Sequence, residues 1–261
     1  MGGATPSSDR LVIRDGRIVT GIDSYDASIL IERGVIKAIG RHLEVPDDVP
    51  VYDAGGKLIL PGVVDARAHV SEERVGHESS GFEETTREAA LGGVTTYITA
   101  ARPAERQSLP DAVDAAVLEA TGLSHVDFAL HAGYARASER EDGEVADLVE
   151  FGVPSLTVST GGIDDPTAIG DDELYSLLLE AAREKALVCV RCETGWLTRR
   201  RTDRLAGDGK LDASELAASR PSYAEGEAVA RTLRAAFQAE APACLVNVST
   251  GESIAAVGEA A

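Results

Sequence analysis

The feature that most constrains the fold of this chain is a regular alternation of short apolar runs with longer amphipathic runs after residue 56. Six apolar runs have the length and composition of buried strands, and they occupy residues 57–65, 94–100, 126–132, 154–160, 186–192 and 243–249. Repeated strand–helix units favour a parallel sheet, because each helix returns the chain to the end at which the strand began. We therefore predict an α/β protein, built as a (β/α) barrel or as a doubly wound sheet. No G-x-G-x-x-G or Walker loop follows a strand, which disfavours nucleotide binding.

Three of the amphipathic runs predict particular helices. Residues 171–186 have Asp171 or Asp172 as the expected N-cap, and one face carries Leu174, Leu177, Leu178 and Ala181. Residues 222–240 open with Ser222 and Glu225 in the spacing of a capping box, and the face expected to be buried carries Val229, Leu233, Ala236 and Phe237. The third helix is expected to stop at the glycine pair 92–93.

The first 56 residues have a different rhythm, with short strand patterns separated by turn signals. Asp15-Gly16 and Arg33-Gly34 are both expected to be hairpin turns. We therefore predict two domains: a small antiparallel β unit over residues 1–56, and the strand–helix region over residues 57–261.

Composition limits the class of partner. The net charge is −19, and the 25 basic residues comprise four lysines and twenty-one arginines. Nucleic acid and anionic membrane surfaces attract proteins of the opposite sign, so we expect neither as a partner. An acidic, lysine-poor chain is typical of a salt-rich cytoplasm, and a GC-rich coding bias produces the same preference for arginine; the sequence leaves both explanations open.

The three cysteines are too few for a disulfide framework and favour a reducing compartment, so we expect a cytoplasmic protein. Cys189 and Cys192 form a C-x-x-C motif inside an apolar run. A spacing of three on a strand puts the two side chains on opposite faces, so we interpret them as buried residues and not as a metal site.

An ordered series of segments along the chain resembles the dihydropyrimidinase/hydantoinase branch of the amidohydrolase superfamily. The segments include RLVIRDGRIVT, ASILIERGVIKAIG, KLILPGVVDARAH, FEETTREAALGGVTT, FGVPSLTVST, VRCETG, SRPSYAEGEAVAR and CLVNVST. The resemblance implies a metal-bearing (β/α) TIM-type barrel joined to a small β-sandwich. Since the sequence ends soon after its sixth strand, we expect a partial barrel of about six parallel strands and a β-sandwich portion over residues 1–56.

The family hydrolyses cyclic amides with two divalent ions, which are bridged by a carboxylated lysine and a hydroxide. Matching the motifs residue by residue, only His69 keeps a family ligand. The other ligand positions in the covered region fall on Arg67, Thr157, Arg191 and Asn247, and the family's oxyanion tyrosine falls on Gly162. An arginine has no lone pair to give a metal. The resemblance therefore implies a protein that binds no metal, with zinc expected only if the chain is a hydrolase after all.

In a (β/α) barrel the functional residues collect at the carboxyl ends of the strands. The residues expected to line a pocket there are Asp65, Arg67, His69, His131, Thr157, Arg191, Glu193 and Asn247. Asp65 and Glu193 are expected to pair with the two arginines, because buried charges need partners. His77 lies in the loop after the first barrel strand and is expected to be solvated.

Three interpretations of function remain open. The first is a catalytically inactive relative that serves as a binding, scaffold or regulatory subunit. The second is a hydrolase of cyclic amide C–N bonds in dihydropyrimidines or hydantoins, and the third is a truncated gene product without function. We also expect self-association, or a partner chain that supplies the missing barrel half, because an incomplete barrel has unpaired edge strands. A small anionic ligand between Arg67 and Arg191 is a further expectation.

Overall fold

The computed structural model describes residues 9–44, 47–70, 81–104, 106–134, 143–161, 165, 168–210 and 212–260. The chain forms two compact units that divide between Val63 and Val64, later than the boundary at residue 56 suggested by the sequence. Each unit is described by itself. Among the described residues, no helix has the length and apolar content needed to cross a bilayer.

The N-terminal unit is a mixed sheet of five strands. β1 (Arg10–Val19), β2 (Ser24–Glu32) and β3 (Val35–Gly40) are antiparallel neighbours, whereas β4 (Val51–Asp53) and β5 (Leu58–Ile59) pair in parallel with β1. The antiparallel arrangement expected from the sequence holds for β1, β2 and β3, and the two short strands add parallel pairings to β1. Its small core contains Ile18, Ala27 and Ile29.

The two expected hairpin turns have different outcomes. Arg33 and Gly34 form the turn between β2 and β3, and both have positive φ angles of 51° and 74°. The prediction for Asp15-Gly16 was wrong, because β1 continues through both residues and its register with β2 shifts there. Asp15 has a φ of 55°. The Asp-Gly pair therefore marks an irregularity within the strand and not a reversal of the chain.

The C-terminal unit contains one six-stranded sheet with the order β11-β10-β9-β8-β7-β6. Its strands are β6 (Val63–Ala68), β7 (Val94–Ala101), β8 (Asp127–Gly133), β9 (Ser155–Ser159), β10 (Leu187–Arg191) and β11 (Ala243–Val246). All six predicted runs contribute a strand, and the pairings from β7 to β11 are parallel. The unit is a curled half-barrel of the TIM type, as the sequence predicted.

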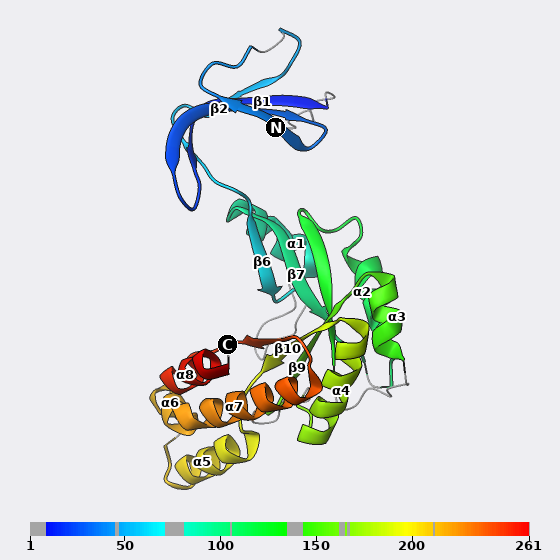
Figure 1. The fold of residues 1–261 in the computed structure, drawn as a ribbon. Helices are drawn as coiled ribbons and strands as arrows, with labels where there is room; N and C mark the ends of the chain where they lie inside the picture. The colour runs from blue at the N-terminus through cyan, green and yellow to red at the C-terminus, as the bar shows by residue number, and fades with distance from the viewer. Residues whose placement is uncertain are drawn as a thin grey trace. The chain divides into compact units, whose positions relative to one another are not determined.

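Helices follow the strands and cover one face of the sheet (Figure 1). They are α1 (Gly81–Leu91), α2 (Leu109–Ala120), α3 (Glu144–Phe151), α4 (Asp171–Glu184), α5 (Gly195–Gly207), α6 (Leu216–Ser219), α7 (Ser222–Ala239) and α8 (Gly251–Ala260), with a 3-10 turn at Ala213–Glu215. The main core lies between the central strands and α2, α3, α4 and α7; Leu156, Val188, Leu177, Leu178 and Val229 are fully buried in it. Burial of these aliphatic side chains holds the carboxyl ends of the strands in place.

Two helix predictions need correction at their ends. α4 buries the four predicted residues, but its N-cap is Gly170, whose backbone N–H donates to the Glu173 carboxylate at 2.8 Å. α7 begins after Pro221, and Ser222 does not cap it. Phe237, predicted to be buried, is 78% exposed, because it lies about 80° around the helix from the buried Val229.

Candidate functional site

Four of the predicted site residues stand at the carboxyl ends of strands in the half-barrel. Arg67 belongs to β6, Thr157 to β9 and Arg191 to β10, and Asn247 follows β11 directly. Asn247 has a φ of 60°, a left-handed conformation that asparagine tolerates better than most residues. The fold thus brings together side chains that are up to 180 residues apart in sequence.

Arg67 connects these strand ends through its guanidinium group. Its Nε donates to Asn247 Oδ1 at 3.1 Å, and its Nη1 donates to Thr157 Oγ1 at 3.4 Å. Asp65 does not supply the expected ion pair in these contacts, since its carboxylate accepts from the Arg67 backbone N–H at 3.0 Å. The guanidinium therefore joins β6, β9 and the end of β11 through neutral acceptors.

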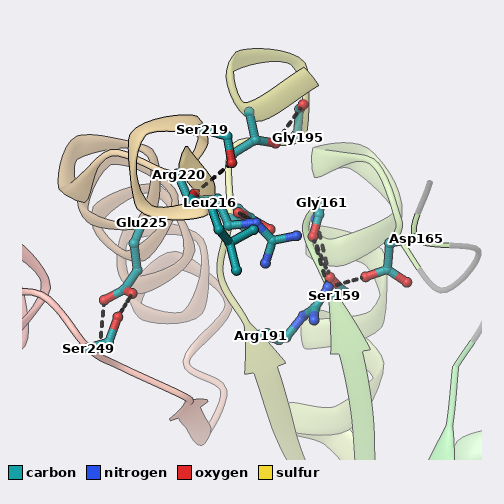
Figure 2. A network of polar contacts seen from close by, with 12 residues as sticks. Ser159, Gly161, Asp165, Arg191, Gly195, Leu216, Ser219, Arg220, Glu225 and Ser249 are labelled. Atoms are coloured by element: carbon teal, nitrogen blue, oxygen red, sulfur yellow. Dashed lines mark hydrogen bonds and ion pairs between the residues drawn. The ribbon is translucent and has the colours of Figure 1, made fainter. Parts of the chain in front are cut away.

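Arg191 turns toward the loop that follows β9. Its Nη2 donates to Asp165 Oδ2 at 2.6 Å, and the Asp165 side chain is only 11% exposed (Figure 2). Gly161 shapes this loop, because a Cβ there would lie 2.5 Å from the Glu193 carbonyl oxygen. Glu193, expected to pair with Arg191 or Arg67, instead lies 3.6 Å from Arg220 Nε. The strand ends at Arg191, so Glu193 lies beyond it and does not follow the alternation of strand side chains.

His131 has a structural position beneath the strand ends. Its Nδ1 lies 2.7 Å from Ser155 Oγ, and its Nε2 lies 3.1 Å from the Ala66 carbonyl oxygen. A carbonyl only accepts, so Nε2 carries the proton and Nδ1 accepts from Ser155. The imidazole thus ties β8 to β9 and β6.

Two adjacent cavities open at the strand ends, and both are lined by Arg67, His69 and Arg191. The larger, of about 360 Å³, extends along Glu193, Arg220 and Glu225. The smaller, of about 170 Å³, is bounded by Arg102, Thr157, Ser159 and Asp165. Of the expected pocket residues, Asp65 and His131 do not line either cavity within the described part of the chain.

Glu225 fixes the loop that carries Asn247. Its carboxylate accepts from the backbone N–H of Ser249 and Thr250 at 2.9 and 3.0 Å, and from both hydroxyl groups. Burial alone would raise the pKa of Glu225, but these hydrogen bonds outweigh it and lower the pKa to about 2. Figure 2 shows this contact on the side of the site opposite Arg191 and Asp165.

Sequence reasoning missed the roles of Asp165, Arg220 and Glu225. Glu225 was assigned to a capping box, a signal that fits its spacing from Ser222 but not its actual partners. Asp165 and Arg220 lie in loops, where no periodicity indicates the direction of a side chain. Gly162 and His77 lie outside the described residues.

The two cysteines of the C-x-x-C motif separate as predicted. Cys189 lies in register with Cys244 of β11, whereas Cys192 packs in the main core and its Sγ lies 3.4 Å from Thr232 Oγ1. Burial raises the pKa of each of these two thiols to about 11. Both are therefore protonated near neutral pH and unsuited to bind a metal as thiolates.

The side chains at the strand ends do not fit a metal centre. Within the described residues, no three His, Cys, Asp or Glu side chains are grouped closely enough to hold one ion. Arg67 and Arg191 offer only donors, and Asn247 and Thr157 already accept from Arg67. What this arrangement offers a ligand is hydrogen-bond donors and positive charge.

The chain is similar in sequence to dihydropyrimidinase-related proteins and hydantoinases. No protein-family profile matches the chain. The chain is 31% identical to human dihydropyrimidinase-related protein 5 over 258 residues, which are 97% of this chain and 46% of that protein. It is also 31% identical to the D-hydantoinase of Geobacillus stearothermophilus over 251 residues, which are 95% of this chain and 53% of that enzyme.

Solved structures of dihydropyrimidinase and D-hydantoinase are also similar to this chain. The dihydropyrimidinase from Brevibacillus agri superposes with a TM-score of 0.87 at 30% identity, over 96% of this chain and 54% of the other. A D-hydantoinase crystal structure gives 0.86 at 31% identity, over 96% and 55%. The chain spans about half the length of the curated relatives that it matches. It is therefore a homologue of the dihydropyrimidinases and hydantoinases of the amidohydrolase superfamily, at about 30% identity over most of its own length.

Proposed function

We propose that this chain is a non-hydrolytic member of the dihydropyrimidinase/hydantoinase group that binds a small molecule at its strand ends, as a binding or regulatory subunit. The observation that carries the proposal is the bridge from Arg67 to Thr157 and Asn247. These are three of the positions at which the family motif calls for metal ligands.

Electrostatics supports the same conclusion. A guanidinium about 5 Å from a divalent ion, at an effective dielectric constant near 20, opposes the ion by roughly 7 kcal/mol. Arg67 and Arg191 both stand at former ligand positions, so both would contribute this repulsion. The pair of arginines supplies positive charge without the Lewis acidity that the family's reaction requires.

The remaining side chains support binding more than chemistry. Thr157 and Asn247 orient the Arg67 guanidinium, and Glu225 holds the loop on which Asn247 stands. Asp165 orients Arg191. These contacts preorganise two planar donors at the cavity wall, which favours recognition of an acceptor-rich ligand.

A ring-opening assay tests the proposal. The purified chain is incubated with hydantoin and with dihydrouracil, with and without added zinc, beside an active D-hydantoinase. We expect turnover only by the D-hydantoinase. Turnover by this chain that a chelator abolishes and zinc restores would overturn the proposal and favour the cyclic-amide hydrolase.

A further inference from the structure

The arginines at the strand ends are a local reversal of the charge of the whole chain. The sequence has 44 acidic and 25 basic residues, yet the described lining of the smaller cavity contains Arg67, Arg102 and Arg191 against the single carboxylate of Asp165. In the adjoining cavity, Arg220 extends toward the side where Gly161 and Arg191 lie (Figure 2). An acidic protein that gathers guanidinium groups around one cavity provides a site for negative charge.

We infer that the smaller cavity is a binding site for a small oxyanion, a carboxylate or a phosphate group, held by Arg191 and Arg67. This inference rests on the proposed function. If metal ions were bound at the strand ends, they and not the arginines would supply the positive charge of the pocket.

Arg191 has donors to offer such an anion. Its contacts with Asp165 Oδ2 and with the Gly161 carbonyl oxygen both use Nη2, at 2.6 and 3.5 Å. Within the described part of the chain, Nε and Nη1 of Arg191 make no hydrogen bond. Their N–H groups are therefore donors that the oxygens of a carboxylate or of a phosphate group can accept from.

The acidic residues nearby are engaged elsewhere, so they do not compete for these donors. Glu225 accepts four hydrogen bonds from Ser249 and Thr250, and Glu193 pairs with Arg220. The Asp165 carboxylate accepts from Nη2 of Arg191 and so fixes the orientation of the guanidinium without using Nε or Nη1. In addition, the Thr157 hydroxyl accepts from Arg67, which leaves its own proton available to an anion.

The size of the cavity limits the ligand. About 170 Å³ accommodates a compact group such as malonate or inorganic phosphate, and the adjoining 360 Å³ accommodates a substituent attached to it. A cationic ligand is disfavoured by the three arginines.

The test is calorimetric titration of the whole chain with malonate and, separately, with inorganic phosphate, at constant ionic strength set by sodium chloride. We expect saturable binding of at least one of the two at millimolar concentration or tighter. Preferential binding of malonate identifies the carboxylate class, and preferential binding of phosphate identifies the phosphate class. No binding of either anion by a folded chain would overturn the inference.

Variants distinguish binding at this cavity from a general attraction of anions to arginine side chains. Arg191→Lys keeps the positive charge beside Asp165 but loses the planar guanidinium with its Nε and Nη1 donors, and we expect it to weaken binding about tenfold or more. Arg102→Ala removes a second lining arginine without disturbing that ion pair, and it should also weaken binding. Arg183→Ala, on the exposed surface of α4, is the matched control and should bind as the parent does. Equal binding by all four proteins would contradict the proposed site.

The metal content of the same sample separates the two proposals. A zinc-free chain that binds neither anion refutes the oxyanion site and leaves the non-hydrolytic function standing. A chain that holds zinc and opens the hydantoin ring refutes the proposed function, and the oxyanion site with it.

Discussion

Arg67 and Asn247 are separated by 180 residues, and a hydrogen bond of 3.1 Å joins their side chains. β6 and β11, whose ends they mark, are the two outermost strands of the six-stranded sheet. One arginine therefore joins the carboxyl ends of the two outermost strands, and it also contacts Thr157 on β9, which lies between them in the strand order. Arg67, at a position where the resemblance to the family implies a metal ligand, is thus a cross-link between strands.

Removing this cross-link should loosen both outer strands. Arg67→Ala deletes the hydrogen bonds to Asn247 and Thr157 and leaves the buried Thr157 hydroxyl without that donor, so we expect the free energy of unfolding to fall by about 1–3 kcal/mol. Denaturant unfolding measures the loss, and amide hydrogen exchange should show faster exchange in peptides from β6 and β11. Arg183→Ala is the control. Unchanged stability and exchange in Arg67→Ala would mean that the bridge does not hold the strand ends.

Acid sensitivity should report on Glu225. Its pKa is lowered from 4.5 to about 2, so its ionised form stabilises the fold fully above about pH 4.5, and this contribution is lost as the pH falls through about 2. Glu225→Gln should therefore melt at a lower temperature than the parent at neutral pH. The difference between the two melting temperatures should shrink steadily between pH 4.5 and pH 2.

Glu150→Gln, on the exposed surface of α3, provides the comparison for Glu225→Gln, since it removes a carboxylate of the same charge. We expect it to melt close to the parent throughout. A gap between Glu225→Gln and the parent that stays constant down to pH 2 would show that the carboxylate is not the stabilising group.

Self-association should increase with salt. β6 and β11 are terminal strands of the sheet. The helices that precede and follow β11 in the sequence carry exposed apolar side chains: Phe237 of α7 is 78% exposed and Ile254 of α8 is 65% exposed. Apolar surface favours pairing with a second copy, whereas a net charge of −19 opposes it until salt screens the repulsion. Light scattering coupled to size exclusion should show a rising mass from low to high salt, and Phe237→Ser should reduce that rise. A monomer of constant mass at every salt concentration would refute this prediction.

The sheet was predictable from sequence because its strands are short apolar runs bounded by polar loops. All six runs contribute strands, but the first one splits: Pro61-Gly62 interrupts it, and Leu58–Ile59 joins the N-terminal sheet through β1. Strand periodicity gave no basis for predicting this division, since both halves of the run are equally apolar.

The residues of the candidate site were easier to predict from the sequence than the hydrogen bonds and ion pairs that they make. Arg67, Thr157, Arg191 and Asn247 follow from the order of the strands, because parallel strands end at one edge. The ion-pair partners of Arg191 and Glu193 could not be predicted from the strand order. Those partners, Asp165 and Arg220, lie in loops, where the direction of a side chain depends on tertiary packing. The prediction that Phe237 is buried was wrong for a related reason. An apolar residue at helical spacing is buried only where another element covers it.

Zinc content is the decisive measurement of whether Arg67 and Arg191 stand in place of metal ions. The chain is purified, dialysed against buffered zinc beside an active D-hydantoinase, and analysed for metal per chain by mass spectrometry. We predict no stoichiometric zinc in this chain, because Arg67 and Arg191 offer no lone pair and Thr157 and Asn247 accept hydrogen bonds from Arg67. Two tightly held equivalents of zinc per chain would show that the two arginines do not exclude metal ions.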